Sequence, residues 1–130
     1  MTNGRPILIV DDDIDIRSVV RRTLVAHGYR TTEAGDGIAA FTSARDDPPA
    51  LVVLDLGLPG QDGWAVAQQI HAEPNLESVP IVVITAYDSG PTRLSAWVAG
   101  CQDVIAKPFA LATLENAISA CLSDQAMLVA

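Results

Sequence analysis

Short apolar segments alternate with longer amphipathic segments along this chain. Four of the short segments consist almost entirely of aliphatic residues, and a weaker one lies between the first two. In chain order the five span Pro6–Val10, Tyr29–Glu33, Leu51–Leu54, Ile81–Ile84 and Val104–Ala106. The strong segments do not alternate apolar with polar residues, which is typical of strands that helices cover on both faces of a parallel sheet.

The longer segments have the three- and four-residue spacing of amphipathic helices. The first is predicted to begin at Asp13 as its N-cap, to carry Ile16, Val20 and Leu24 in register, and to stop at Gly28. Further helical patterns cover residues 36–44, 63–72, 91–100 and 110–122. Five strand–helix repeats predict an α/β fold, with a doubly wound five-stranded parallel sheet and five helices.

The predicted helix 91–100 has two stripes of residues spaced four apart. Leu94 and Val98 lie one turn apart and are predicted to face the core. Arg93 and Trp97 form a neighbouring stripe, so Trp97 either lies flat on its own domain or anchors a protein interface. Trp64, at the start of the helix 63–72, is predicted to pack against the domain.

Length and charge narrow the function. The chain has 130 residues, enough for one compact domain, and 49% of them are hydrophobic. The net charge of −8 argues against nucleic acid as a direct partner, because phosphate binding needs a basic surface. Apolar segments stay below the roughly 18 residues of a membrane helix, so we expect a cytoplasmic protein with no membrane partner. Cys101 and Cys121 lack metal-site spacing and are expected to be free thiols.

Polar residues with metal and phosphate chemistry follow the strong apolar segments. Asp11 and Asp12 follow the first segment, Asp55 the second, Thr85 the third and Lys107 the fourth. Because the carboxyl ends of parallel strands meet at one edge of an open sheet, these side chains are predicted to converge on one site.

Together these side chains suit phosphoryl transfer. Carboxylates held close together repel one another and favour a divalent cation, and hard oxygen ligands suit Mg²⁺. Asp55, at the end of a buried strand, is the predicted nucleophile, and it needs no general base because a carboxylate is ionised at neutral pH. Lys107 and the metal would offset charge on the phosphoryl oxygens, and Thr85 would donate a hydrogen bond to one of them.

Four sequence segments, in this order, resemble the receiver domains of two-component response regulators. They read ILIVDDD, VVLDLGLPGQDGW, PIVVITA and AKPF, and the resemblance extends from Pro6 to about Leu122. It implies a CheY-like, flavodoxin-like sheet with strand order 2-1-3-4-5. It also implies a response regulatory (receiver) domain over residues 5–123, followed by a short C-terminal tail over residues 124–130.

The resemblance assigns roles to individual residues. The residue that matches Asp55 is phosphorylated by a histidine kinase or a phosphotransfer protein, and Thr85 and Lys107 match the switch hydroxyl and the lysine of that reaction. The Lys107–Pro108 bond matches a peptide bond that is usually cis. Such a domain is not an enzyme beyond its own phosphorylation and dephosphorylation, and Mg²⁺ is its cofactor. The metal ligands implied are Asp11, Asp12, Asp55 and the backbone carbonyl of Gly57.

One position departs from the family's usual pattern, and two others are positions at which the family varies. Receivers usually carry an aromatic residue three positions before the lysine, where this chain has Val104. The hypothesis is that signal output here relies less on coupling between an aromatic ring and the Thr85 hydroxyl, or uses another residue. Gly57 and Tyr87 occupy the positions that tune how long the phosphate lasts. The resemblance implies that a downstream partner or a second copy binds the surface of the fourth helix, fifth strand and fifth helix, the Trp97/Val104 face.

Other functions fit the residues less well. A phosphohydrolase of the D-x-D type needs a second carboxylate two positions after Asp55, where Gly57 stands. A flavin- or nucleotide-binding module needs a glycine- or hydroxyl-rich loop after the first strand, where three aspartates stand instead. Two alternatives stay open: a phosphorylation-independent interaction scaffold, and the receiver fragment of a longer DNA-binding regulator. We expect a stand-alone regulator rather than such a fragment.

Overall fold

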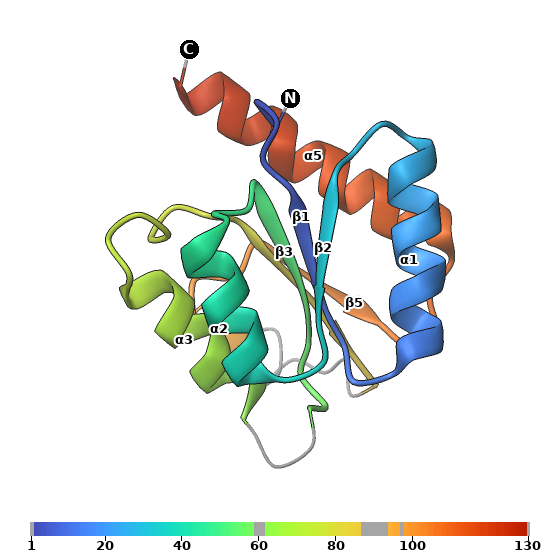
Figure 1. The fold of residues 1–130 in the computed structure, drawn as a ribbon, viewed down its shortest axis with the longest axis horizontal. Coiled ribbons are helices and arrows are strands. Elements are labelled where there is room, and N and C mark those ends of the chain that lie inside the picture. Colours follow the sequence, from blue (N-terminus) through green and yellow to red (C-terminus); the bar gives the residue numbers. More distant parts are fainter. Residues whose placement is uncertain (1, 59–61, 87–93, 97, 130) are drawn as a thin grey trace.

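A computed structural model describes residues 2–58, 62–86, 94–96 and 98–129 of the chain. Five parallel strands form one sheet in the order β2-β1-β3-β4-β5, which confirms the predicted fold class (Figure 1). The strands are β1 (Ile7–Val10), β2 (Thr31–Ala34), β3 (Leu51–Asp55), β4 (Ile81–Thr85) and β5 (Asp103–Ala106). The helices are α1 (Ile14–Ala26), α2 (Gly37–Asp46), α3 (Gly63–Ala72) and α5 (Leu111–Val129).

Helices cover both faces of the sheet, α1 and α5 on one side and α2 and α3 on the other (Figure 1). Alternate strand residues therefore enter two separate cores. Leu8 and Val10 pack with α2 and α3, whereas Ile7 and Ile9 pack with α1 and α5. All four residues of β1 are fully buried, which explains why this strand is apolar throughout rather than alternating.

The edge strand β2 begins two residues later than the sequence pattern predicts. Gly28 follows α1 with a φ of 89°, a left-handed conformation that glycine adopts without strain. The N–H groups of Gly28 and Tyr29 donate to the carbonyls of Val25 and Leu24. The end of α1 thus uses residues 28 and 29, and pairing with β1 starts at Thr31.

Aspartates begin three of the helices. Asp13 accepts hydrogen bonds from the N–H groups of Asp15 and Ile16, as predicted for an N-cap. Asp36 and Asp62 cap α2 and α3 in the same way. Each cap of this kind contributes about 1 kcal/mol to stability. These aspartates therefore have structural roles, and they are distinct from the acidic residues discussed below.

The prediction for the helix 91–100 is wrong about its core face. Leu94 is 65% exposed and Val98 is 74% exposed, whereas Ala96 and Ala99 are buried. The small side chains of Ala96 and Ala99 pack in the core, and the larger aliphatic residues point outward. Pro91, Arg93, Trp97 and Tyr87 lie outside the described residues, so the predictions made for them stay predictions.

The last helix is longer than predicted. Leu114, Ile118 and Leu122 of α5 are buried on one face, at the spacing of an amphipathic helix. The helical backbone then continues to Val129, through residues 124–129, where the resemblance implies a short C-terminal tail.

Candidate functional site: an acidic cluster at the carboxyl edge of the sheet

The strand register brings the predicted site residues to one edge of the sheet. Val10 pairs with Leu54, so Asp11 and Asp55 follow neighbouring positions of β1 and β3. Asp55 pairs with Ile84, and Thr85 with Ala106, the residue before Lys107. The carboxyl ends of β1, β3, β4 and β5 therefore meet, as the sequence predicts.

Three carboxylates gather at this edge. Asp11, Asp12 and Asp55 each place one carboxylate oxygen within 4.8 Å of the others. Asp11 is fully buried and Asp55 is 4% exposed, while Asp12 faces solvent. Burial of two like charges beside a third is unfavourable unless a cation accompanies them.

The ammonium of Lys107 lies between the two buried carboxylates. Its Nζ is 2.9 Å from Asp55 Oδ2 and 3.2 Å from Asp11 Oδ2. Burial by itself lowers the pKa of Lys107, but the hydrogen bond to Asp55 and the charges of both aspartates raise it above its usual value. Lys107 is therefore charged at neutral pH and balances one of the three carboxylates.

Ionisation of the Asp11 carboxyl group is disfavoured in this arrangement. Burial raises the pKa of Asp11, and the charge of Asp55 adds to that effect. The N–H of Asp13 and the ammonium of Lys107 act in the opposite direction, but the pKa stays above its ordinary value. A raised pKa in a cluster of acids marks a place where ionisation needs a further positive charge.

Each buried carboxylate is held by a backbone N–H and by the lysine. Asp11 Oδ1 accepts from the N–H of Asp13 at 2.9 Å, and Asp55 Oδ1 accepts from the N–H of Gly57 at 2.9 Å. The Oδ2 atoms of both accept from Lys107. Both carboxylates are thus fixed in orientation before any ligand binds, which reduces the cost of assembling a metal site.

The segment around Lys107 is also fixed in place. The Lys107 N–H donates to the Thr85 carbonyl at 2.7 Å, which joins the ends of β4 and β5. Thr85 is 4% exposed and belongs to the same edge. The Lys107–Pro108 peptide bond is cis, as the resemblance implies.

The donor set fits Mg²⁺. Hard carboxylate oxygens at this spacing are the ligands that Mg²⁺ prefers, and the surplus of acids over the single lysine supplies the charge that attracts it. Gly57 is exposed, and a Cβ at this position would lie 3.4 Å from Asp55 Oδ1. The absence of a side chain at Gly57 leaves the approach to Asp55 open.

Sequence reasoning missed one residue of this site. Arg17, on α1, donates from Nη1 to the backbone carbonyl of Asp11 at 2.7 Å. Its side chain is 17% exposed and also pairs with Glu33 of β2. The available signal was an arginine one turn into the helix that follows the acidic run, but a bond to a backbone carbonyl leaves no pattern in the sequence.

Other predicted residues lie away from the acidic cluster. Val104 is 6% exposed and belongs to the core cluster under α2 and α3. Trp64 packs against the same cluster from the start of α3, as predicted. Neither Cys101 nor Cys121 forms a disulfide, and burial raises the pKa of Cys101 to about 11, so its thiol is unreactive at neutral pH.

Comparisons with a family profile and with individual proteins agree on one family. The family profile described as "Response regulator receiver domain" matches residues 7–119. A probable transcriptional regulator ycf27 of Cyanophora paradoxa is 36% identical over 120 residues, covering 92% of this chain and 49% of the relative. The response regulator MprA of Mycobacterium avium (strain 104) is 40% identical over 108 residues, covering 83% of this chain and 46% of the relative. The chain thus spans about half the length of these relatives.

Solved structures agree with the sequence relatives. The receiver domain of the sensor histidine kinase PA1611 from Pseudomonas aeruginosa PAO1 superimposes with a TM-score of 0.82 at 33% identity. The match covers 92% of this chain and 98% of that one, and that structure has a magnesium ion coordinated in its active site cleft. Among the described residues of the present chain, none of the helices is both long and apolar enough to cross a membrane.

Proposed function

The chain belongs to the response regulator receiver domains of two-component systems, and on that premise we propose that Asp55 is its phosphoryl acceptor. The observation that carries the proposal is the position of the buried Asp55 carboxylate. Its Oδ2 lies 2.9 Å from Lys107 Nζ, within a cluster that also contains Asp11 and Asp12. A nucleophile, a cation and a set of metal ligands therefore share one edge of the sheet.

The reaction follows from the properties of these side chains. An oxygen of the Asp55 carboxylate attacks the phosphorus of a phosphohistidine, which forms an aspartyl phosphate. The P–N bond breaks, and its electron pair returns to the imidazole of the donor. Lys107 then shifts its contact from Asp55 to a phosphoryl oxygen. The Thr85 hydroxyl donates a hydrogen bond to another phosphoryl oxygen.

Metal binding is the second part of the proposal. Asp11, Asp12, Asp55 and the carbonyl of Gly57 would hold Mg²⁺ at the exposed side of the cluster. When bound, Mg²⁺ supplies positive charge that offsets the negative charge developing on the phosphoryl oxygens. The buried positions of Asp11 and Asp55 support this role, because two buried carboxylates beside a third need more than one lysine to balance them.

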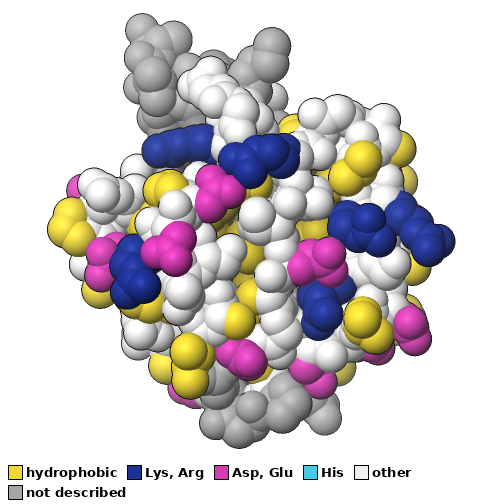
Figure 2. Space-filling model, in the orientation of Figure 1, with side chains coloured by type: hydrophobic (Ala, Val, Ile, Leu, Met, Phe, Trp, Pro, Cys, Tyr) yellow, Lys and Arg dark blue, Asp and Glu magenta, His cyan; other side chains and the backbone are white. Residues whose placement is uncertain are grey.

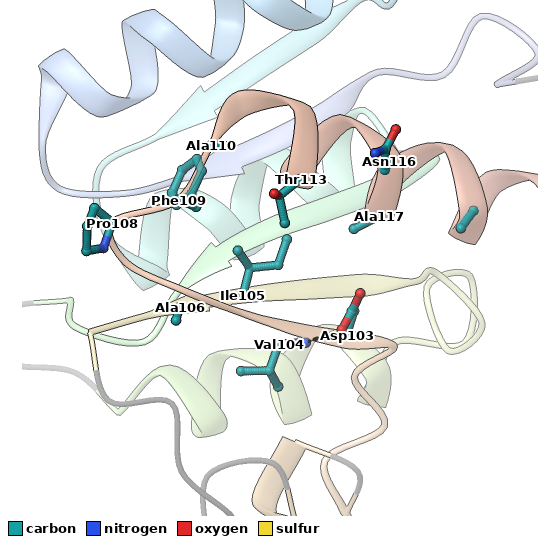
Figure 3. A pocket seen from close by; sticks show the side chains of 11 residues that line it. Asp103, Val104, Ile105, Ala106, Pro108, Phe109, Ala110, Thr113, Asn116 and Ala117 are labelled. Atoms are coloured by element: carbon teal, nitrogen blue, oxygen red, sulfur yellow. Dashed lines mark hydrogen bonds between the residues drawn. The ribbon is translucent and has the colours of Figure 1, made fainter.

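The donor and the output are proposed from the family. The phosphoryl group comes from a histidine kinase or a phosphotransfer protein. A partner protein or a second copy then binds the surface of the fourth helix, β5 and α5, the Trp97/Val104 face, in which Val104 itself is only 6% exposed. A groove of about 610 Å³ lies between β5 and the start of α5. In Figure 3, Ile105 faces Thr113 and Ala117 across it, while Val104 points to the other side of the strand. That groove supports docking on β5 and α5.

Mass spectrometry with a small phosphodonor tests the acceptor. Incubation with acetyl phosphate and Mg²⁺ is expected to add one phosphoryl mass to the parent and none to Asp55→Asn. Asp46→Asn, an exposed acid on α2, is the matched control and should still take up the group. Phosphoryl mass on Asp55→Asn at the level of the parent would reject Asp55 as the acceptor. Loss of uptake when EDTA replaces Mg²⁺ tests the metal requirement.

The scaffold alternative makes a different prediction in the same experiment. A phosphorylation-independent scaffold would take up no phosphoryl group in any variant. The intact set of Asp11, Asp55 and Lys107 contacts favours the phosphorylated function. Membership in a longer DNA-binding regulator stays a separate possibility, because the relatives are about twice the length of this chain.

A further inference from the structure

The peptide unit between Asp11 and Asp12 lies where the pairing of β1 with its neighbours ends. Val10 is the last residue of β1 that pairs with β2 and β3. The Asp11 N–H still donates to the Ala34 carbonyl at 3.1 Å. The Asp11 carbonyl, one peptide further, accepts from Arg17 Nη1 at 2.7 Å instead of from a strand.

This peptide unit sets the direction of two of the three acids. A peptide is planar, so the Asp11 carbonyl and the Asp12 N–H turn as one unit. A change in the ψ angle of Asp11 would turn this unit and carry the carboxylate of Asp12 to a different position relative to that of Asp11. Arg17 holds the plane from its carbonyl side, while Lys107 holds the carboxylate of Asp11. The two cations therefore hold different parts of the same residue.

Arg17 is itself held in place. Its Nε donates to Glu33 Oε1 at 3.2 Å, and the other oxygen of Glu33 pairs with Arg21 Nε at 3.4 Å. Figure 2 shows basic and acidic side chains next to one another over the junction of α1 and β2. A guanidinium presents its donors in a rigid plane, so the bond to Glu33 aims Nη1 at the Asp11 carbonyl.

Gly35 leaves room for this guanidinium. A Cβ added at Gly35 would lie 3.2 Å from Arg17 Nη1, closer than an ordinary contact. Gly35 stands in the turn between β2 and α2, directly after Ala34. Gly35 in the turn and Glu33 of β2 thus both lie next to the Arg17 side chain of α1, which donates to the Asp11 carbonyl.

We propose that Arg17 is a positioning residue for the acidic site, which orients the Asp11–Asp12 peptide so that both carboxylates are ready to bind a divalent cation. The proposal rests on the proposed function of this site as a Mg²⁺ site. Arg17 acts through the backbone of Asp11 and touches neither the metal nor the phosphoryl group. Outer contacts of this kind typically change metal affinity by about 10- to 100-fold when they are removed.

Calorimetric titration with MgCl₂, without a phosphodonor, tests the proposal. Arg17→Met is expected to weaken Mg²⁺ binding by about tenfold. Arg21→Met is the matched control, because Arg21 pairs with the other oxygen of Glu33, whereas the bond to the Asp11 carbonyl comes from Arg17. Its Mg²⁺ affinity should stay within about twofold of the parent, since outer contacts matter when they orient a ligand. Equal affinities of Arg17→Met and the parent would overturn the proposal.

Two further measurements separate positioning from a general structural role. Hydrogen exchange of the Asp12 amide is expected to speed up in Arg17→Met, whereas exchange of the Val82 amide in β4 should not change. Gly35→Ala is expected to weaken Mg²⁺ binding in the parent and to have no further effect in Arg17→Met, where the guanidinium is gone. Additive effects of the two substitutions would contradict the proposal.

Arg17→Lys keeps the experiment decisive if Arg17→Met does not fold. A lysine retains the charge and one bond but lacks the planar pair of donors, so an intermediate Mg²⁺ affinity is expected. Affinity equal to the parent in Arg17→Lys would reject positioning by the guanidinium. Because the titration uses Mg²⁺ alone, its outcome does not depend on Asp55 accepting a phosphoryl group.

Discussion

Acidic and basic side chains pair at both ends of the parallel strands, but their charges balance only at the amino end, here called the amino edge. At the amino edge, Arg30 precedes β2 and donates to both oxygens of Asp47 at 2.9 and 3.1 Å, and its Nε donates to the Gly4 carbonyl. At the carboxyl edge, Lys107 is shared by Asp11 and Asp55, with Asp12 close by. The first edge pairs one cation with one acid, and the second has more acids than cations.

The pKa values of the acids reflect this difference. The hydrogen bond from Arg30 lowers the pKa of Asp47 below its ordinary value. Burial raises the pKa of Asp11 above its ordinary value, despite Lys107. An exposed, matched pair fastens neighbouring segments, whereas a buried, unmatched cluster carries a charge deficit that a ligand can fill. Function is therefore expected at the edge where the charges do not balance.

Removal of Lys107 should have the largest effect. Lys107→Met is expected to slow phosphoryl uptake from acetyl phosphate by about a hundredfold, because it removes a cation from the transition state. The same change should tighten Mg²⁺ binding, since the ammonium no longer competes for Asp11 and Asp55. Rates from quenched mass spectrometry and affinities from calorimetry measure the two effects. Arg30→Met, at the other edge, should change neither, and a fall of both quantities together in Lys107→Met would contradict this account.

Stability without metal should change in opposite directions at the two edges. Asp12→Ala is expected to raise the free energy of unfolding by up to about 1 kcal/mol in EDTA, because it relieves repulsion among the carboxylates. Arg30→Met should lower the free energy of unfolding, because it leaves Asp47 without its bidentate partner. Urea unfolding checks both variants, and added Mg²⁺ should stabilise the parent more than Asp12→Ala. A loss of stability in Asp12→Ala would mean that the cluster is not under repulsion.

The smallest effects should appear in the pH dependence of unfolding. The pKa of Asp47 is lowered in the fold, so its contribution is present above the ordinary value of 3.8 and is lost as the pH falls through the folded pKa. The pKa of Asp11 is raised, so its contribution is present below 3.8 and is lost as the pH rises through the folded pKa. In metal-free buffer, Asp47→Asn should reduce the loss of unfolding free energy as the pH falls below 3.8. Asp11→Asn should reduce the loss of unfolding free energy as the pH rises above 3.8. An acid-induced loss of stability that is the same in Asp47→Asn as in the parent would contradict this account.

Most of the fold could be predicted because its signals are strong. Strands such as β1 are buried on both faces, so their apolar runs are uninterrupted, and α3 has the bounds that its pattern predicts. Prediction was less accurate where backbone hydrogen bonds or side-chain size decide the outcome. The cap of α1 delays β2, and alanines rather than Leu94 and Val98 face the core. The segment 123–129 contains neither Gly nor Pro, so nothing in it stops the helix α5.

The candidate site could be predicted because parallel strands bring their carboxyl ends together. Asp11, Asp55 and Lys107 each follow an apolar run, and their contacts follow from the strand order. Arg17 could not be found in this way. Its partners are a backbone carbonyl and an acid on the edge strand, and neither belongs to a pattern that the sequence displays. A contact between a side chain and a backbone carbonyl can be identified only in the folded structure.

The long last helix has a practical consequence. Figure 1 places both chain ends beyond the amino edge of the sheet, away from the acidic cluster at the opposite edge. The backbone of α5 runs on to Val129, about 10 Å past Leu122 at the usual rise per residue. A surface anchor or a fluorescent protein fused after Val129 would therefore leave the acidic edge open to solvent. An immobilised form of this chain is thus a suitable starting point for a sensor that reports Mg²⁺ or a phosphodonor.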